Sequence, residues 1–92
     1  MVKNITVTYT GRDRLIRFAT GYAKVGTRVT VAYDDFNGGE EVLEGVVDEI
    51  LPGQFIPTVV VRFANGRTED LTSDLYNNLT DYRVLRVQRH RF

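Results

Sequence analysis

The chain has no cysteine and no tryptophan, and its only histidine is His90. The absence of cysteine excludes a disulfide framework, a thiolate nucleophile and a zinc site built on thiolates. No run of about 18 apolar residues occurs, which excludes a transmembrane helix. Residues 1–10 alternate between apolar and polar side chains, unlike the apolar core of a signal peptide. We therefore expect a cytoplasmic protein with no membrane partner.

The sequence also has few of the residue patterns on which catalysis depends. His90 lies in a basic terminal segment without a nucleophile motif, so a solvated side chain is a better interpretation than a general base. The acidic pairs, such as Asp34-Asp35 and Glu40-Glu41, lack the spacing of a calcium loop. No glycine-rich segment has a phosphate-loop pattern. We predict that the protein is not an enzyme and holds no metal or other cofactor.

What the chain does have is a strong segregation of charge. Its 92 residues suit one domain, residues 1–92, and its 12 basic and 12 acidic residues give a net charge of zero. The net charge is +5 over residues 1–28, −9 over residues 29–81 and +4 over residues 82–92. Ten of the 12 basic residues are arginine, whose forked side chain suits carboxylate and phosphate.

Alternation of apolar and polar residues predicts several short strands. It is strict over residues 4–10 and 27–33, and residues 57–64 are rich in β-branched side chains. Asn65-Gly66 follows, the preferred pair for a two-residue type I′ hairpin. In that register residues 67–71 return, and Arg62 faces Glu69. Residues 72–79 predict one helical turn and residues 82–87 a last strand.

Two segments fit both helix and strand. Residues 41–51 have apolar residues at helical spacing, but Gly45 and several β-branched side chains disfavour a helix, so we favour a strand. Residues 15–19 predict a returning strand that forms a hairpin over residues 4–19. A short helix over residues 14–19 is the alternative.

The order of these elements is itself informative. Residues 26–33 enter a strand from a glycine, residues 44–50 place glycine before alternating Val and Ile, and residues 59–66 end in the Asn-Gly turn. Residues 70–75 lead from a strand into the helical turn, and residues 82–87 follow as a closing strand. This order resembles the SH3-like barrel of Tudor and KOW modules.

The resemblance and the strand pattern together predict an all-β fold. We expect a small SH3-like (Tudor/KOW-like) barrel of five to six short strands over residues 26–87. To this barrel residues 1–24 add an N-terminal hairpin extension, and one short helical turn precedes the closing strand. Residues 88–92 are expected to form a basic tail.

The basic segments suggest a nucleic-acid partner. Both ends of a chain often meet in a barrel, so terminal arginines could form one phosphate-binding face. The candidate residues are Arg12, Arg14, Arg17, Arg83, Arg86 and Arg89. The alternatives are internal neutralisation of the acidic middle, or a protein–protein adaptor of viral or phage origin. Such an adaptor would use the acidic loop of residues 34–41 or a strand edge, and could be a homo-oligomer.

The resemblance to Tudor modules implies a further candidate site. Tudor modules that read methylated residues hold the cation among aromatic side chains near the first loop and the third strand. The matching positions are Tyr33, Phe36 and Phe63, with Asn65 beside them. Tyr33 and Phe63 also fit a purely structural role, because strand aromatics commonly lie in the core.

Overall fold

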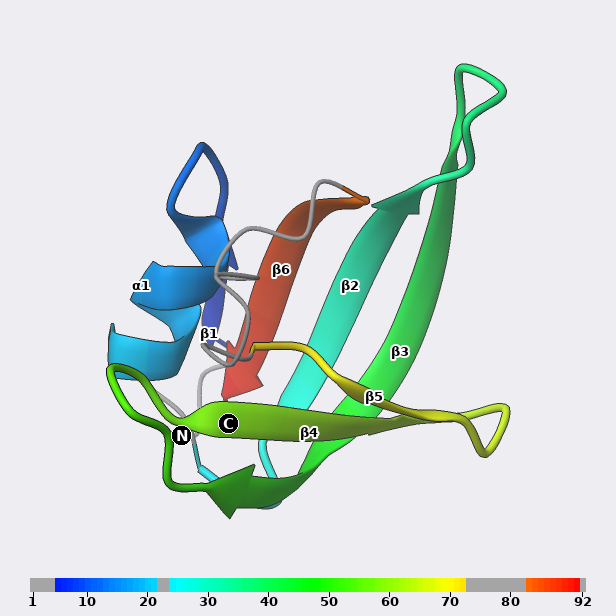
Figure 1. Ribbon diagram of the computed structural model, residues 1–92. Coiled ribbons are helices and arrows are strands. Elements are labelled where there is room, and N and C mark those ends of the chain that lie inside the picture. The colour runs from blue at the N-terminus through cyan, green and yellow to red at the C-terminus, as the bar shows by residue number, and fades with distance from the viewer. Residues whose placement is uncertain (1–4, 22–23, 73–82, 92) are drawn as a thin grey trace.

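The computed structural model describes residues 5–21, 24–72 and 83–91, which form six strands and one helix (Figure 1). In chain order these are β1 (Ile5–Tyr9), α1 (Arg14–Gly21), β2 (Arg28–Asp34), β3 (Glu40–Leu51), β4 (Thr58–Phe63), β5 (Thr68–Asp70) and β6 (Val84–Arg91). The strands form one antiparallel sheet in the order β1-β6-β2-β3-β4-β5. The all-β class is therefore confirmed, although the sheet is open, with β1 and β5 as its edges.

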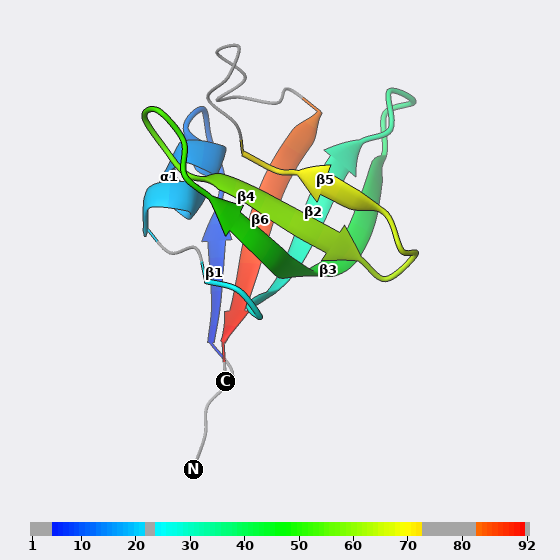
Figure 2. The same ribbon diagram turned by 60° about the horizontal axis from the view of Figure 1, so that its bottom comes forward.

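The curved sheet wraps one of its faces around the hydrophobic core, and α1 lies beside β1 and β6 (Figure 2). The centre of the core is valine-rich, with Val31, Val61 and Val87 fully buried. Helix α1 adds Leu15 and Phe18, both fully buried. Within the described residues no helix is long and apolar enough to cross a membrane. The opposite, outer face of the sheet carries polar side chains, such as Thr30 and Arg62, together with exposed apolar ones, such as Val42 and Val46.

The prediction of an N-terminal hairpin over residues 4–19 is wrong, because residues 14–21 form helix α1 and β1 pairs with β6 instead. A strand would have placed Leu15 and Phe18 on opposite faces. A helix places Leu15, Phe18 and Ala19 on one face, and all three are buried. Burying the two larger side chains contributes roughly 1.5–3 kcal/mol each. The short helix was the weighed alternative, and tertiary packing favours it.

The prediction of a strand over residues 41–51 is confirmed by β3. The first half of β3 pairs with β2 and its second half with β4, and Gly45 has a partner on each side, Val29 and Phe63. A Cβ at Gly45 would lie 2.6 Å from the Arg62 carbonyl oxygen and 2.8 Å from Cγ1 of Val61. Only glycine allows the two neighbouring strands to approach this closely.

The predicted register of the Asn65-Gly66 hairpin is wrong by one residue. The Gly66 amide donates to the Phe63 carbonyl at 2.9 Å, and the Phe63 amide donates to the Arg67 carbonyl at 2.8 Å. Gly66 has a φ of 88°, whereas Asn65 is not among the positive-φ residues, so the turn is type I followed by a glycine bulge. Arg62 consequently faces Thr68 rather than Glu69.

The predicted basic tail of residues 88–92 is wrong over its described part, because β6 continues to Arg91. Pairing with β2 on one side and β1 on the other supplies the backbone partners that extend this strand. The predicted helical turn at 72–79 lies outside the described residues except for Thr72. This buried threonine accepts from the Val59 amide at 2.9 Å and donates to the Pro57 carbonyl at 2.8 Å.

Candidate functional site

The predicted basic residues of the N-terminal segment lie around the turn between β1 and α1. Arg12 is exposed in this turn. The Arg14 guanidinium donates to the Gly11 carbonyl at 2.7 Å, and that of Arg17 donates to the Thr10 carbonyl. Two of these three arginines therefore stabilise the turn that starts the helix, a structural role that the sequence alone did not indicate.

The predicted basic residues of the C-terminal segment are divided among different surroundings. Arg86 forms two hydrogen bonds with the Glu40 carboxylate, at 2.8 and 2.6 Å. These hydrogen bonds hold the pKa of the Glu40 carboxyl below its ordinary value. Arg89 lies on the opposite face, level with Val7 and Val29. The six predicted arginines thus do not come together as one face.

Of the four residues predicted to form an aromatic cage, Tyr33 and Phe63 meet edge to face with ring centroids 6.3 Å apart. Phe63 is only 2% exposed and belongs to the core. Asn65 lies in the β4–β5 turn, where its side-chain oxygen accepts from the Arg67 amide at 2.9 Å. Phe36 projects from the β2–β3 loop with 64% of its surface exposed. Only Tyr33 and Phe36 line a common hollow.

This hollow, which we call the acidic mouth, has a volume of about 280 Å³ and lies between the β2–β3 loop and the β4–β5 hairpin. Its apolar lining comes from Tyr33, Phe36 and Leu43. Its charged lining consists of four carboxylates and two guanidinium groups, from Asp34, Asp35, Glu41, Glu69, Arg67 and Arg83. The mouth therefore combines ring faces with an excess of negative charge.

The β2–β3 loop that carries Phe36 is held by its own aspartates. The Asp34 carboxylate accepts from the Phe36 amide at 2.8 Å, and the Asp35 carboxylate accepts from the amides of Asn37 and Gly39 at 2.8 and 3.0 Å. Phe36 has a φ of 64°, the one positive φ outside glycine among the described residues. Since this conformation is costly for a bulky side chain, the aspartates act to fix the ring at the mouth.

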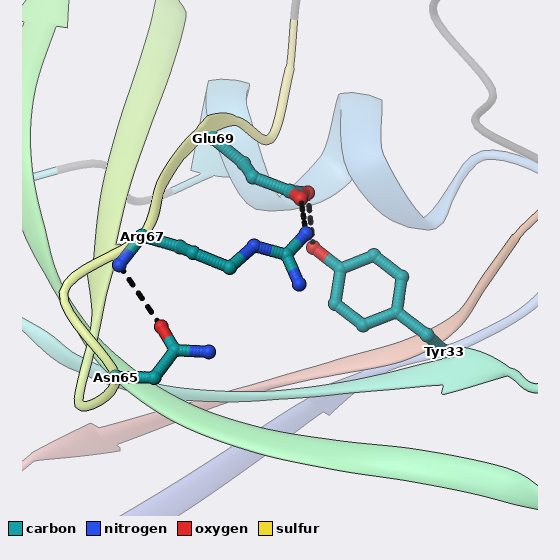
Figure 3. A network of polar contacts seen from close by, with 4 residues as sticks. All are labelled: Tyr33, Asn65, Arg67 and Glu69. Atoms are coloured by element: carbon teal, nitrogen blue, oxygen red, sulfur yellow. Dashed lines mark hydrogen bonds and ion pairs between the residues drawn. The ribbon is translucent and has the colours of Figure 1, made fainter.

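A polar network on the other side of the mouth shows that one carboxylate already holds a cation (Figure 3). The Tyr33 hydroxyl donates to Oε2 of Glu69 at 3.0 Å, and the Arg67 guanidinium donates to Oε1 of the same carboxylate. The Arg67 side chain is 57% exposed. A guanidinium from this chain thus lies at the mouth, beside a tyrosine and within reach of solvent.

Sequence reasoning identified the aromatic residues of the mouth but missed Glu41, Leu43, Glu69 and Arg67 as their neighbours. These residues become neighbours only because two hairpins come together in the fold. The alternation of residues within single strands carries no information about that approach. Within the described residues, no three His, Asp or Glu side chains are arranged to hold a metal ion.

No family model, no curated protein and no solved structure matches this chain. The geometry of its own residues is therefore the basis on which a function is proposed.

Proposed function

We propose that this protein is a non-enzymatic binding module that takes a cationic side chain of a protein partner into the acidic mouth. The observation that carries this proposal is the convergence of four carboxylates with the rings of Tyr33 and Phe36 around one hollow. A ring face attracts a cation by about 0.5–1 kcal/mol at an exposed site, and the surrounding carboxylates add a steering field for a basic segment.

The internal position of Arg67 supports a guanidinium as the group that is bound. Its contact with Glu69 shows that the mouth accommodates this group beside the Tyr33 hydroxyl. The Arg67 side chain of this pair is 57% exposed and the Glu69 side chain 23% exposed. A partly exposed pair of this kind is worth about 1 kcal/mol, so an incoming arginine or methylated lysine can displace Arg67.

We also propose that residues 26–87 form an SH3-like unit. β2, β3, β4 and β5 follow one another in the sheet in chain order, and β6 returns to lie beside β2. This arrangement of an open sheet supports the resemblance to Tudor and KOW modules. The mouth also lies between the first loop and the hairpin after the third strand of that unit, where Tudor modules hold their cage.

Nucleic-acid binding through the six predicted arginines stays a prediction. The contacts of these arginines favour it less than the acidic mouth favours a cationic peptide. Arg86 is already paired with Glu40, and Arg14 and Arg17 donate to turn carbonyls. The expected cytoplasmic location and phage or viral origin likewise stay predictions.

Fluorescence anisotropy with a labelled arginine-rich peptide, in unmodified and dimethylated forms, tests the proposal. We expect saturable binding that Phe36→Ala weakens about two- to fivefold and that Glu69→Gln also weakens. Glu49→Gln is the matched control, because Glu49 is exposed on β3 outside the mouth. Absence of binding, or equal losses from Glu49→Gln and Glu69→Gln, would overturn the proposal.

A further inference from the structure

The outer face of the sheet carries a row of aligned side chains that crosses five strands. Strand register places Thr6 of β1 opposite His90 of β6, His90 opposite Arg28 of β2, Arg28 opposite Val46 of β3, and Val46 opposite Arg62 of β4. Residues opposite one another share a face of the sheet, so the register by itself places His90 and the two arginines on one surface.

The row lines the larger of the two hollows described, about 620 Å³ in volume, which we call the outer hollow. Thr30 and Glu44 from the neighbouring row also line it. Gly45 also lines the hollow and, because it has no side chain, contributes backbone atoms to it. None of these residues contributes to the acidic mouth, so the two hollows are separate features of the molecule.

His90 is held on both edges of its ring. Its Nδ1 lies 3.2 Å from the Thr6 hydroxyl, and its Nε2 lies 2.7 Å from the Thr30 hydroxyl, both within hydrogen-bonding distance. Because hydroxyl groups of the neighbouring strands contact both ring nitrogens, a ligand would contact the face of the His90 ring rather than its edge. A ring fixed in this way is a platform for stacking, as histidine provides in single-strand recognition.

The arginines supply the charge that such a platform needs. Arg62 shares its guanidinium with Asp48 at 3.2 Å, but this pair is exposed, with 57% and 40% of the two side chains accessible. An exposed pair exchanges readily for a phosphate. Arg28 is exposed next to His90, and Glu44 is the one acidic residue among those that line the hollow.

The length of the row favours a polymer over a single anion. Arg28 and Arg62 are two strands apart, or about 10 Å at the usual spacing between strands. A strand with repeating phosphates meets both arginines and offers a base to the His90 ring at the same time, which a single phosphate does not. Aromatic platforms combined with a cationic track are the common design of sequence-tolerant single-strand binders.

We propose that the outer hollow binds the backbone of single-stranded nucleic acid, with Arg28 and Arg62 on phosphates and a base stacked on His90. This second activity does not depend on the function proposed for the acidic mouth. It also uses residues other than the six arginines that the charge pattern suggested.

Fluorescence anisotropy with labelled oligo-dT and oligo-U, titrated with salt, tests this inference. We expect Arg28→Gln and Arg62→Gln each to weaken binding and to lower the salt slope by roughly 0.7. His90→Ala should weaken binding about tenfold. His90→Phe, which keeps a ring but loses both threonine contacts, should retain more binding than His90→Ala, and thermal unfolding verifies that each variant folds.

Lys24→Gln serves as the matched control, because it removes one exposed positive charge outside the hollow and outside the six predicted arginines. Its affinity for the oligonucleotide should fall only by the small contribution of one remote charge, and much less than that of Arg62→Gln. The inference is overturned by absent binding at low salt, or by equal losses in Lys24→Gln and Arg62→Gln. Equal competition by a mononucleotide or by a glutamate-rich peptide would also overturn it, since neither is a phosphodiester strand.

Discussion

The acidic mouth and the outer hollow are built in different ways from the same sheet. The mouth lies at the ends of two hairpins, and its groups are fixed by local contacts such as that of Asp34 with the Phe36 amide. The outer hollow lies on regular strands, where pairing alone aligns His90, Arg28 and Arg62. The acidic site thus combines strand ends with loop residues, whereas strand register alone aligns the basic one.

This difference follows from how the sheet orders the chain. The carboxylates of the mouth all belong to the acidic middle of the sequence, in β2, β3, β5 and the loop after β2. Arg28 and His90 come from the two basic ends, which antiparallel pairing of β6 with β2 brings together. The segregation of charge along the chain is thus kept in space only in part, because Arg62 of the outer hollow comes from the acidic middle and Arg83 of the mouth from a basic end. Arg86 and Glu40 form an ion pair between the basic C-terminal segment and the acidic middle.

The largest expected effect is at the glycine where β3 lies against β4. Gly45→Ala places a Cβ 2.6 Å from the Arg62 carbonyl oxygen, where backbone rather than a flexible side chain must move. We expect a loss of about 1–3 kcal/mol in the free energy of unfolding, measured by urea denaturation, and weaker oligonucleotide binding, because Gly45 lines the outer hollow.

Gly21→Ala is the control for that change, since a Cβ there would meet only the Tyr9 hydroxyl, at an ordinary 3.9 Å. At the last residue of α1 this substitution should change the free energy of unfolding by less than about 1 kcal/mol. Equal stability of Gly45→Ala and wild type would show that β3 and β4 do not approach as closely as the structure describes.

A smaller effect is expected from removing the cation that the mouth already holds. Arg67→Gln frees the Glu69 carboxylate and should raise affinity for the arginine-rich peptide by about two- to fivefold, while stability changes by less than about 1 kcal/mol. Isothermal titration calorimetry measures this change. Weaker peptide binding in Arg67→Gln would mean that Arg67 supports the ligand rather than competing with it.

The smallest effect concerns the ion pair of Arg86 with Glu40. The pKa of Glu40 is lowered in the folded protein by its hydrogen bonds with Arg86, so the pair stabilises the fold above the ordinary carboxyl pKa of 4.5 and ceases to do so as pH falls below it. Thermal unfolding of Glu40→Gln should therefore differ slightly from wild type near neutral pH and converge with it in acid. A difference in Tm between Glu40→Gln and wild type that persists in acid would contradict the assignment of this stabilisation to the Glu40–Arg86 pair.

The strands of the fold could largely be predicted from the sequence, because alternation is a local signal. It located β2, β3 and β4, including the ambiguous segment around Gly45. Helix α1 was missed because eight residues contain little periodicity, and burial of Leu15 and Phe18 decides its conformation. The end of β6 was missed because its backbone partners lie in β1, far away in sequence.

The sites could be predicted only in part, for the same reason. Tyr33 and Phe36 were identified from a resemblance in element order, whereas Glu69 joins them only because the hairpin turn has a glycine bulge that resets its register. His90 was interpreted as a solvated tail residue. The structure places it on a central face between two threonine hydroxyls, which no pattern within residues 88–92 could indicate.

The most direct test of two separate sites is a reciprocal binding measurement on Phe36→Ala and Arg62→Gln. Each variant is titrated by anisotropy with the arginine-rich peptide and with oligo-dT under identical salt conditions. We predict that Phe36→Ala loses affinity for the peptide alone and that Arg62→Gln loses affinity for the oligonucleotide alone. Parallel losses of both ligands in either variant, with the fold intact, would contradict the assignment of opposite charges to separate partners.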